Sequence, residues 1–265
     1  MTSWPDTLHL LADVHLADDT SPAAQQLAGY LAGPARGAAA VYILGDLFDV
    51  WVGDDVSFDT HRATLDALAG LAAARVPLYF QRGNRDFAVG ARFFTHTGAR
   101  PIADPVVHRL AGQPVLLAHG DVFCSDDVAH QRFRARYTSA VWRSRMLRVP
   151  AGVRRVLARR ARQRSAAAKM RKDAAIMDVQ ADTVARWARE TETFRIIHGH
   201  THRPGDHTHG RVKRHVLADW RPDRAEILTL SRRAIQRRLL DAEGRFVDTS
   251  GLENASGELS ANERE

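Results

Sequence analysis

Five short apolar runs in this chain each end at residues that can bind a metal ion, and this pattern constrains the fold more than any other feature. The clearest case is the stretch VYILGDLFDVWVGDD, residues 41–55, in which the apolar run stops at Gly45-Asp46. A buried strand followed by a tight turn has this pattern, although Gly-Asp alone is an ordinary turn. The other four runs are Leu8–Leu11 before Asp13 and His15, Val76–Phe80 before Asn84, Pro114–Ala118 before His119, and Thr193–Ile197 before His200 and His202.

Helical patterns alternate with the first of these runs, which predicts an α/β core. Helices are expected near residues 22–31 and 60–74. More than seventy residues separate the fourth run from the fifth, and this interval has helical patterns, so we expect an inserted helical lid at about residues 125–190. Three later runs predict antiparallel strands: Arg211–Leu217, Ala225–Leu230 and Ile235–Leu240. We therefore expect one domain over residues 1–248 and a disordered polar tail over residues 249–265.

Positive charge is concentrated in one internal block of the chain. Of the 38 Lys and Arg residues, 15 lie between Arg132 and Lys172, where there is no Asp or Glu. The remainder is acidic, because it holds the other 23 Lys and Arg residues (38 − 15) against all 31 Asp and Glu residues. Such a block is a local surface feature and not a property of the whole fold. Its aliphatic residues recur at helical spacing, which is typical of a helix that lies on an anionic membrane surface.

Two other readings of the basic block remain open, a solvated helix and a nucleic-acid-binding surface. The second is disfavoured because the block has few large aromatic residues for stacking on bases, namely Phe133, Tyr137 and Trp142. The single cysteine, Cys124, excludes a disulfide framework and suits a reducing compartment such as the cytoplasm. The sequence shows neither a secretory signal nor an apolar run long enough to span a bilayer. We therefore expect a monomer that meets membranes only peripherally, on the cytoplasmic side.

The residues at the five strand ends form a set of metal ligands without sulfur, which suits Mn²⁺, Fe or Zn²⁺ better than Mg²⁺ or Ca²⁺. Each short motif is weak alone, since it also occurs in capped turns and solvated loops. Together they predict a site at the carboxyl ends of the strands. Seven ligands are too many for one ion and suit two, with one carboxylate shared between them. The candidates are Asp13, His15, Asp46, Asn84, His119, His200 and His202, with Asp46 as the shared ligand.

Asp-x-His, Gly-Asp, Gly-Asn, His and Gly-His-x-His in this order resemble the calcineurin-like metallophosphoesterases, over about 230 residues. The resemblance implies a four-layer α/β/β/α sandwich. It implies that one metal is held by Asp13, His15, Asp46 and His202, and the other by Asp46, Asn84, His119 and His200. It also implies catalysis by a hydroxide that bridges the two metals and attacks phosphorus in line.

One departure from the family pattern concerns the residue after Asn84. Many members have His there, which contacts the phosphate, whereas this chain has Arg85 followed by Asp86. An arginine cannot serve as a general acid at neutral pH, but its planar fork suits a diphosphate. We therefore expect Arg85 to act with Asp46, Asn84 and His119 in catalysis by stabilising the phosphate.

The segments LGDLFDVWVGDD, GNRDF, HGDVFCSDD, AIMDV and HGHTHRP resemble one branch of this family closely. Its members are Mn²⁺-dependent hydrolases of the lipid A pathway, peripheral on the inner membrane. They cleave the diphosphate of UDP-2,3-diacylglucosamine into UMP and 2,3-diacylglucosamine 1-phosphate by attack on the α-phosphate. The resemblance implies two Mn²⁺ ions and no nucleic-acid partner. It implies substrate contacts from Asn84, Arg85, Asp127, Ser165, Lys169, Lys172 and His200. The alternatives within the fold are a soluble nucleotide pyrophosphatase and a cyclic-nucleotide phosphodiesterase.

Overall fold

Two β-sheets form the centre of the computed structural model, which describes residues 7–171 and 178–247 and gives only the backbone for residues 165–171. The first sheet has the order β11-β10-β1-β2-β3-β4, and the second has the order β5-β6-β7-β9-β8. The first contains β1 (Leu8–Leu11), β2 (Ala40–Leu44), β3 (Leu78–Gln81), β4 (Arg100–Ile102), β10 (Ala225–Leu230) and β11 (Ile235–Leu240). The second contains β5 (Val106–Leu110), β6 (Gln113–Ala118), β7 (Arg195–His198), β8 (Gly205–His209) and β9 (Val212–Val216).

Alternate side chains of β2 point into two different cores, and this places the sheets face to face. Val41 and Ile43 pack with residues of α1 (Pro22–Ala32), α3 (Arg62–Ala73) and α4 (Ala91–Thr97) on the outer side of the first sheet. Tyr42 and Leu44 pack between the sheets. A strand buried on both faces reads as a continuous apolar run, which explains why the sequence reveals β2 so clearly.

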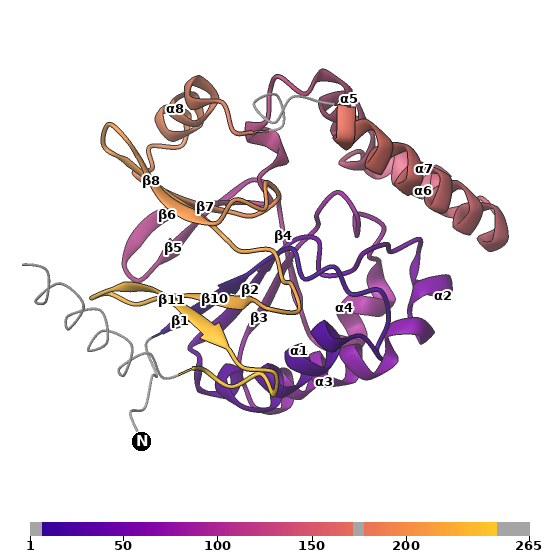
Figure 1. Ribbon diagram of the computed structural model, residues 1–265, viewed down its shortest axis with the longest axis horizontal. Coiled ribbons are helices and arrows are strands. Elements are labelled where there is room, and N and C mark those ends of the chain that lie inside the picture. Colours follow the sequence, from indigo (N-terminus) through magenta and orange to yellow (C-terminus); the bar gives the residue numbers. More distant parts are fainter. Residues whose placement is uncertain (1–6, 172–177, 248–265) are drawn as a thin grey trace, which may run out of the picture.

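The outer layer on the second sheet is α8 (Ala181–Glu190). Val184 and Ala188 of this helix pack against Leu116 and Ile196 of the sheet. The order of layers is therefore helix, sheet, sheet, helix (Figure 1), which confirms the predicted α/β/β/α sandwich. Although α8 lies inside the range expected for the insertion, residues 125–190, its apolar face is part of the outer layer.

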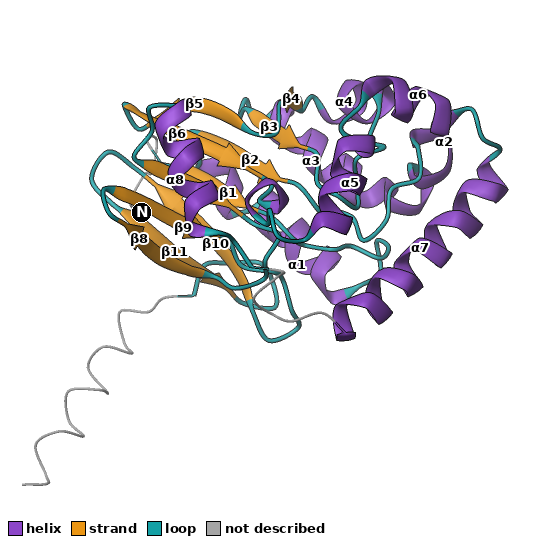
Figure 2. Cartoon of the chain, turned by 90° about the horizontal axis from the view of Figure 1, so that it is seen from above, coloured by secondary structure: helices purple, strands orange, loops and turns teal. Residues whose placement is uncertain are grey.

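Three helices extend beyond the carboxyl ends of the strands: α5 (Val128–Tyr137), α6 (Ala140–Leu147) and α7 (Ala151–Arg171). They lie together at one side of the sandwich, with α7 as the outermost (Figure 2). Asp127 caps α5 and Ser139 caps α6 through their side chains. None of the helices in the described part of the chain is both long and apolar enough to cross a membrane.

The strands and helices that the sequence predicts are present, with bounds shifted by at most two residues. The prediction of antiparallel pairing for the later strands is wrong at β9, which runs parallel to β7 and antiparallel to β8. The sequence does not predict β4, β5 or β8, because β4 has only three residues and all three strands are largely polar or exposed. The tail at residues 249–265 lies outside the described residues.

Asp54 stabilises the start of α4 from a distant loop. Its carboxylate accepts hydrogen bonds from the backbone N–H groups of Gly90, Arg92 and Phe93, and from Nε1 of Trp51. A helix N-terminus exposes unpaired N–H groups, and a carboxylate satisfies both their hydrogen bonds and the helix dipole.

Asp54→Ala is therefore expected to lower the free energy of unfolding by about 2 kcal/mol, the upper range for loss of a helix cap. Chemical denaturation measures this change. Asp59→Ala is the control, because the Asp59 carboxylate is 84% exposed and pairs only distantly with Arg92. Equal effects of the two substitutions would contradict a capping role for Asp54.

Candidate metal centre

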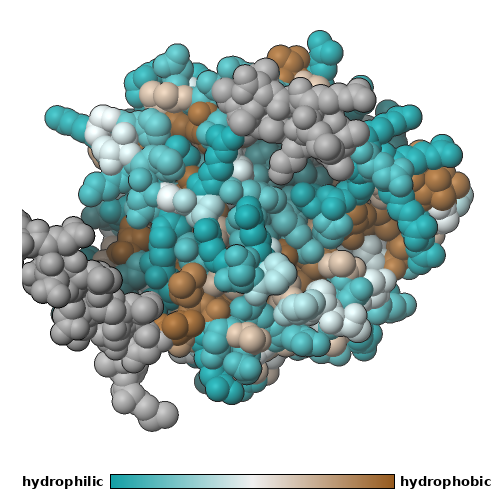
Figure 3. All heavy atoms as spheres, in the orientation of Figure 1, coloured by the Kyte–Doolittle hydropathy of each residue, from teal (hydrophilic) through white to brown (hydrophobic). Residues whose placement is uncertain are grey.

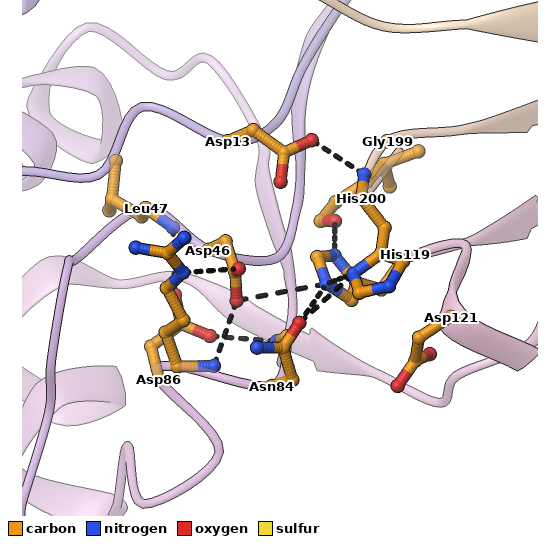
Figure 4. Close-up of polar contacts among 12 residues, drawn as sticks. Asp13, Asp46, Leu47, Asn84, Asp86, His119, Asp121, Gly199 and His200 are labelled. Carbon is orange, nitrogen blue, oxygen red and sulfur yellow. Dashed lines mark hydrogen bonds and ion pairs between the residues drawn. The ribbon is translucent and has the colours of Figure 1, made fainter. Parts of the chain in front are cut away.

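Loops from both sheets meet at one edge of the sandwich, and backbone hydrogen bonds hold them in register. In the first sheet, Asp13 N donates to Gly45 O at 3.1 Å, and His15 N donates to Asp46 O at 3.1 Å. Between the sheets, the backbone N–H of His200 donates to Oδ2 of Asp13 at 2.7 Å (Figure 4). The loops that follow β1, β2 and β7 thus hold their side chains close together at this edge.

Five of the seven predicted ligands have a backbone conformation that non-glycine residues rarely adopt. Their φ angles lie between 53° and 70°. This left-handed region costs free energy for a residue with a side chain, and such residues cluster where the surrounding structure holds them for function. The five residues are Asp13, His15, Asp46, His200 and His202.

Glycines allow the loops to approach one another closely. A Cβ on Gly83 would lie 2.2 Å from Oδ1 of Asp46, and a Cβ on Gly199 would lie 2.3 Å from Oδ2 of Asp13. Neither position has room for a side chain. The Gly83-Asn84 and His198-Gly199-His200 motifs therefore serve the packing of the loops as well as the placement of ligands.

The first group of potential ligands is Asp13, His15 and His202, whose ligand atoms lie within 4.8 Å of one another. Nε2 of His15 and Nε2 of His202 are 3.0 Å apart, so both imidazoles face one point. On its other side, Nδ1 of His202 lies 3.5 Å from a carboxylate oxygen of Asp219. A carboxylate in this position orients an imidazole and selects the nitrogen that remains free to bind a metal.

The second group includes Asp13, Asp46 and His119. Nδ1 of His119 faces the carbonyl oxygen of Leu44 at 3.0 Å, which leaves Nε2 directed into the site. Oδ1 of Asn84 lies 3.0 Å from Nε2 of His119 and 3.0 Å from Nδ1 of His200. Asp13 belongs to both groups, whereas the predicted shared ligand Asp46 belongs only to the second.

Burial and charge set the protonation of these groups. Burial lowers the pKa of His15 to about 2 and holds the pKa of His200 well below its usual value, so both imidazoles are neutral. Burial raises the pKa of Asp46 to about 7. For His119, burial opposes the charged form, but the carboxylates of Asp46 and Asp13 outweigh it and raise the pKa to about 9. The raised pKa values of Asp46 and His119 both show that a positive charge beside these buried carboxylates is favourable.

An unpaired polar atom in the site fits a divalent cation. Oδ1 of Asp13 is buried and has no hydrogen-bond partner among the described residues. Buried polar atoms without partners are costly, and an ion coordinated there removes that cost. Imidazole nitrogens and carboxylate oxygens match the ligands that Mn²⁺, Fe and Zn²⁺ accept. The seven predicted residues therefore lie together and are suited to bind metal.

Arg85 lies directly beside the second group of ligands. Its backbone N–H donates to Oδ1 of Asp46 at 2.9 Å, and its Nε lies 3.3 Å from Oδ2 of Asp46. Asp86 joins the two loops, because its buried carboxylate accepts from Gly83 N at 2.7 Å and from Leu47 N at 2.8 Å. Burial raises the pKa of Asp86. The Gly-Asn-Arg-Asp motif thus places a guanidinium at the edge of the metal centre.

The structure brings three of the predicted substrate contacts, Asn84, Arg85 and His200, to the metal centre. Asp127 begins α5, where its carboxylate accepts from His130 N at 3.0 Å. Ser165 and Lys169 belong to the last turns of α7, where only the backbone is described, and Lys172 lies outside the described residues.

The sequence does not reveal the residues that contact the ligands on the side away from the metal site. Asp219 orients His202, and Asp104 accepts the backbone N–H of His119 at 2.8 Å. Asp104 in turn pairs with Arg134 of α5, which also lies 3.1 Å from the buried Asp121. Of these residues, only Asp121 follows a recognisable motif, because Gly120-Asp121 after the fourth apolar run repeats the pattern of Gly45-Asp46.

The two-group metal centre and the sandwich define a class of protein. A family model described as calcineurin-like phosphoesterase matches residues 7–204. The chain belongs to the calcineurin-like phosphoesterase family, as its motifs predict.

Relatives within this family are named UDP-2,3-diacylglucosamine hydrolase. The relative from Chromobacterium violaceum is 42% identical over 224 residues, which cover 84% of this chain and 94% of the relative. Another, from Aromatoleum aromaticum, is 40% identical over 217 residues, which cover 80% and 89%. A third, from Haemophilus ducreyi, is 37% identical over 230 residues, which cover 87% and 98%. The predicted resemblance to this branch is confirmed.

Asp46→Ala is expected to lose both bound metal ions, because a shared carboxylate is a ligand of each ion. Metal content per chain after loading with Mn²⁺ and dialysis measures this. Asp126→Ala is the matched control, since Asp126 is exposed. Retention of one ion per chain by the Asp46 variant would assign the shared role to Asp13, the residue common to both groups.

Proposed function

We propose that this protein hydrolyses the diphosphate bond of UDP-2,3-diacylglucosamine, giving UMP and 2,3-diacylglucosamine 1-phosphate. The observation that carries the proposal is the guanidinium of Arg85, which lies 3.3 Å from the metal-site carboxylate of Asp46. Relatives with the name of this activity cover most of the chain at about 40% identity. A guanidinium beside a metal centre suits a substrate whose reacting group is a diphosphate.

Two Mn²⁺ ions are proposed as the cofactor. Asp13, His15, Asp46 and His202 would hold one, and Asp46, Asn84, His119 and His200 the other. Bound there, divalent ions would supply Lewis acidity and lower the pKa of coordinated water. The donor set of nitrogen and oxygen atoms supports Mn²⁺ without excluding the other metals of the same preference.

The chain's own residues would bind the diphosphate and hold its orientation. Arg85 is well placed because both its backbone and its side chain are fixed to Asp46, so little conformational entropy is lost when it binds a phosphate oxygen. Asn84 and His200 face the same point from opposite loops. Asp127, Ser165, Lys169 and Lys172, on or near α5 and α7, are proposed to contact the nucleotide and sugar.

The basic helices are proposed to lie on the anionic cytoplasmic face of the inner membrane, where the lipid substrate resides. Exposed apolar residues gather on α6 and α7, at the side where these helices lie (Figure 3). Arginines flank them along α7. Apolar side chains with basic neighbours bind such a surface through both burial and charge. The exposed residues are Val141, Leu147, Val153, Val156 and Leu157.

Incubation with UDP-2,3-diacylglucosamine and Mn²⁺ in ¹⁸O-labelled water tests the reaction. We expect one ¹⁸O atom in UMP, because attack on the α-phosphate leaves the lipid phosphate unlabelled. Mass spectrometry of both products locates the label. Label in the lipid phosphate would contradict the site of attack, and absence of turnover would contradict the proposed substrate.

Arg85→Ala is expected to lower kcat/KM by about 100-fold while both metals remain bound, because it removes a charged donor to the phosphate without removing a ligand. Steady-state kinetics and metal analysis on the same preparation measure the two effects. Arg100→Ala, on the exposed edge strand β4, serves as the control. An unchanged rate would remove Arg85 from the phosphate site.

A further inference from the structure

Asp49 lies between two arginines that come from distant parts of the chain. Its Oδ1 accepts from Nη1 of Arg85 at 2.6 Å and from Nη2 of Arg162 at 2.5 Å. Arg85 belongs to the metal centre, and Arg162 belongs to α7. One carboxylate oxygen thus connects the candidate phosphate-binding residue to the outermost helix.

Asp49 and Arg85 are both fixed to the loops that carry the metal ligands. The backbone N–H of Asp49 donates to Leu16 O at 2.9 Å, next to His15. The carbonyl oxygen of Arg85 accepts from Trp51 N at 3.0 Å, and its N–H donates to Asp46. A small displacement of Asp49 would therefore act directly on the Arg85 side chain, since the backbone on both sides is held.

Helix α7 contacts the same loop at a second point. The buried guanidinium of Arg154 donates to Val52 O and to the carboxylate of Asp55. Arg154 and Arg162 are eight residues apart on the helix, which corresponds to about 12 Å. Among its described side chains, α7 is thus bound to the segment 49–55 by Arg154 and Arg162, and of these two contacts the one from Arg162 reaches the metal centre.

Charge explains why this contact suits a diphosphate. Two guanidiniums share one carboxylate, so the trio keeps a positive charge. Nε and Nη1 of Arg85 face Asp46 and Asp49, whereas Nη2 has no partner among the described residues. Asp49 therefore fixes the plane of the guanidinium and leaves one nitrogen for the substrate.

We propose that Asp49 is a positioning residue that links the docking of α7, through Arg162, to the orientation of Arg85 at the diphosphate. This inference rests on the proposed function, because it assigns Arg85 to the diphosphate of the lipid-linked nucleotide. Asp49 does not touch the substrate itself. Its carboxylate couples the position of α7 to the orientation of Arg85, the residue that contacts the diphosphate.

A double-mutant cycle with UDP-2,3-diacylglucosamine and Mn²⁺ tests the link. Asp49→Asn is expected to lower kcat/KM about 10-fold in the wild-type background, the size of a lost charged hydrogen bond, and to have no further effect in the Arg85→Ala background. Asp49→Glu should recover part of the loss. Arg162→Ala should lower kcat/KM to a similar extent, whereas Asp59→Asn and Arg186→Ala should leave it unchanged, because both residues are exposed and pair with residues outside the metal centre.

Equal losses from Asp49→Asn in both backgrounds would overturn the inference, because the two residues would then act independently. Failure of the wild-type protein to turn over this substrate would instead contradict the proposed function.

Hydrogen exchange then tests the link without a substrate. Asp49→Asn should accelerate amide exchange both in residues 151–164 of α7 and in the loop at residues 83–86. Faster exchange in only one of these segments, or in neither, would overturn the inference.

Discussion

The contact between the Asp13 carboxylate and the backbone of His200 is the interaction on which the site depends. It joins the loop after β1 of one sheet to the loop after β7 of the other, with Oδ2 of Asp13 accepting at 2.7 Å. Asp13 O also accepts from Trp220 N at 3.1 Å. A fully buried carboxylate is expensive, and only hydrogen bonds and nearby positive charge make it tolerable. The His202 imidazole, whose Nε2 lies 3.6 Å from Oδ1, and the charge of His119 outweigh that burial and hold the pKa of Asp13 below its ordinary value. The packing of the two loops and the proposed binding of metal thus depend on the same residue.

The sequence predicts which residues meet at this site, because each follows a buried strand, where a local apolar pattern stops. The bounds of β1, β10 and β11 follow from the same pattern. Which ligands share an ion is harder to derive, because the five strands belong to two sheets and their relative placement depends on long-range packing. Asp219 illustrates the limit. It orients His202 from a segment with no motif of its own, and only the folded chain brings the two side chains within 3.5 Å.

In the segment after Asp46, too, the sequence pattern is distinctive, but the role of each residue depends on distant contacts. The sequence marks residues 47–55 as distinctive but assigns no role to Asp49, Trp51, Asp54 or Asp55. In the structure, Trp51 packs against Phe48, His61 and Phe93, while each acid has a separate partner. Those partners are 36 residues away for Arg85 and Gly90, 99 for Arg154 and 113 for Arg162. Local periodicity contains no information about contacts at such separations.

The same contacts change the interpretation of the basic block. Its charges are not all directed outward, because Arg134, Arg154 and Arg162 pair with acidic residues of the sandwich. On α7, where successive residues turn by about 100°, Arg154 and Arg162 lie within about 80° of each other, and the exposed Val153 and Val156 lie on the other side of the helix. One face of the helix is therefore bound to the acidic segment 49–55, and the opposite face is accessible and carries Val153 and Val156 beside the exposed Arg160. A surface that bound this accessible face would act on a helix already joined, through Arg162 and Asp49, to the guanidinium of Arg85.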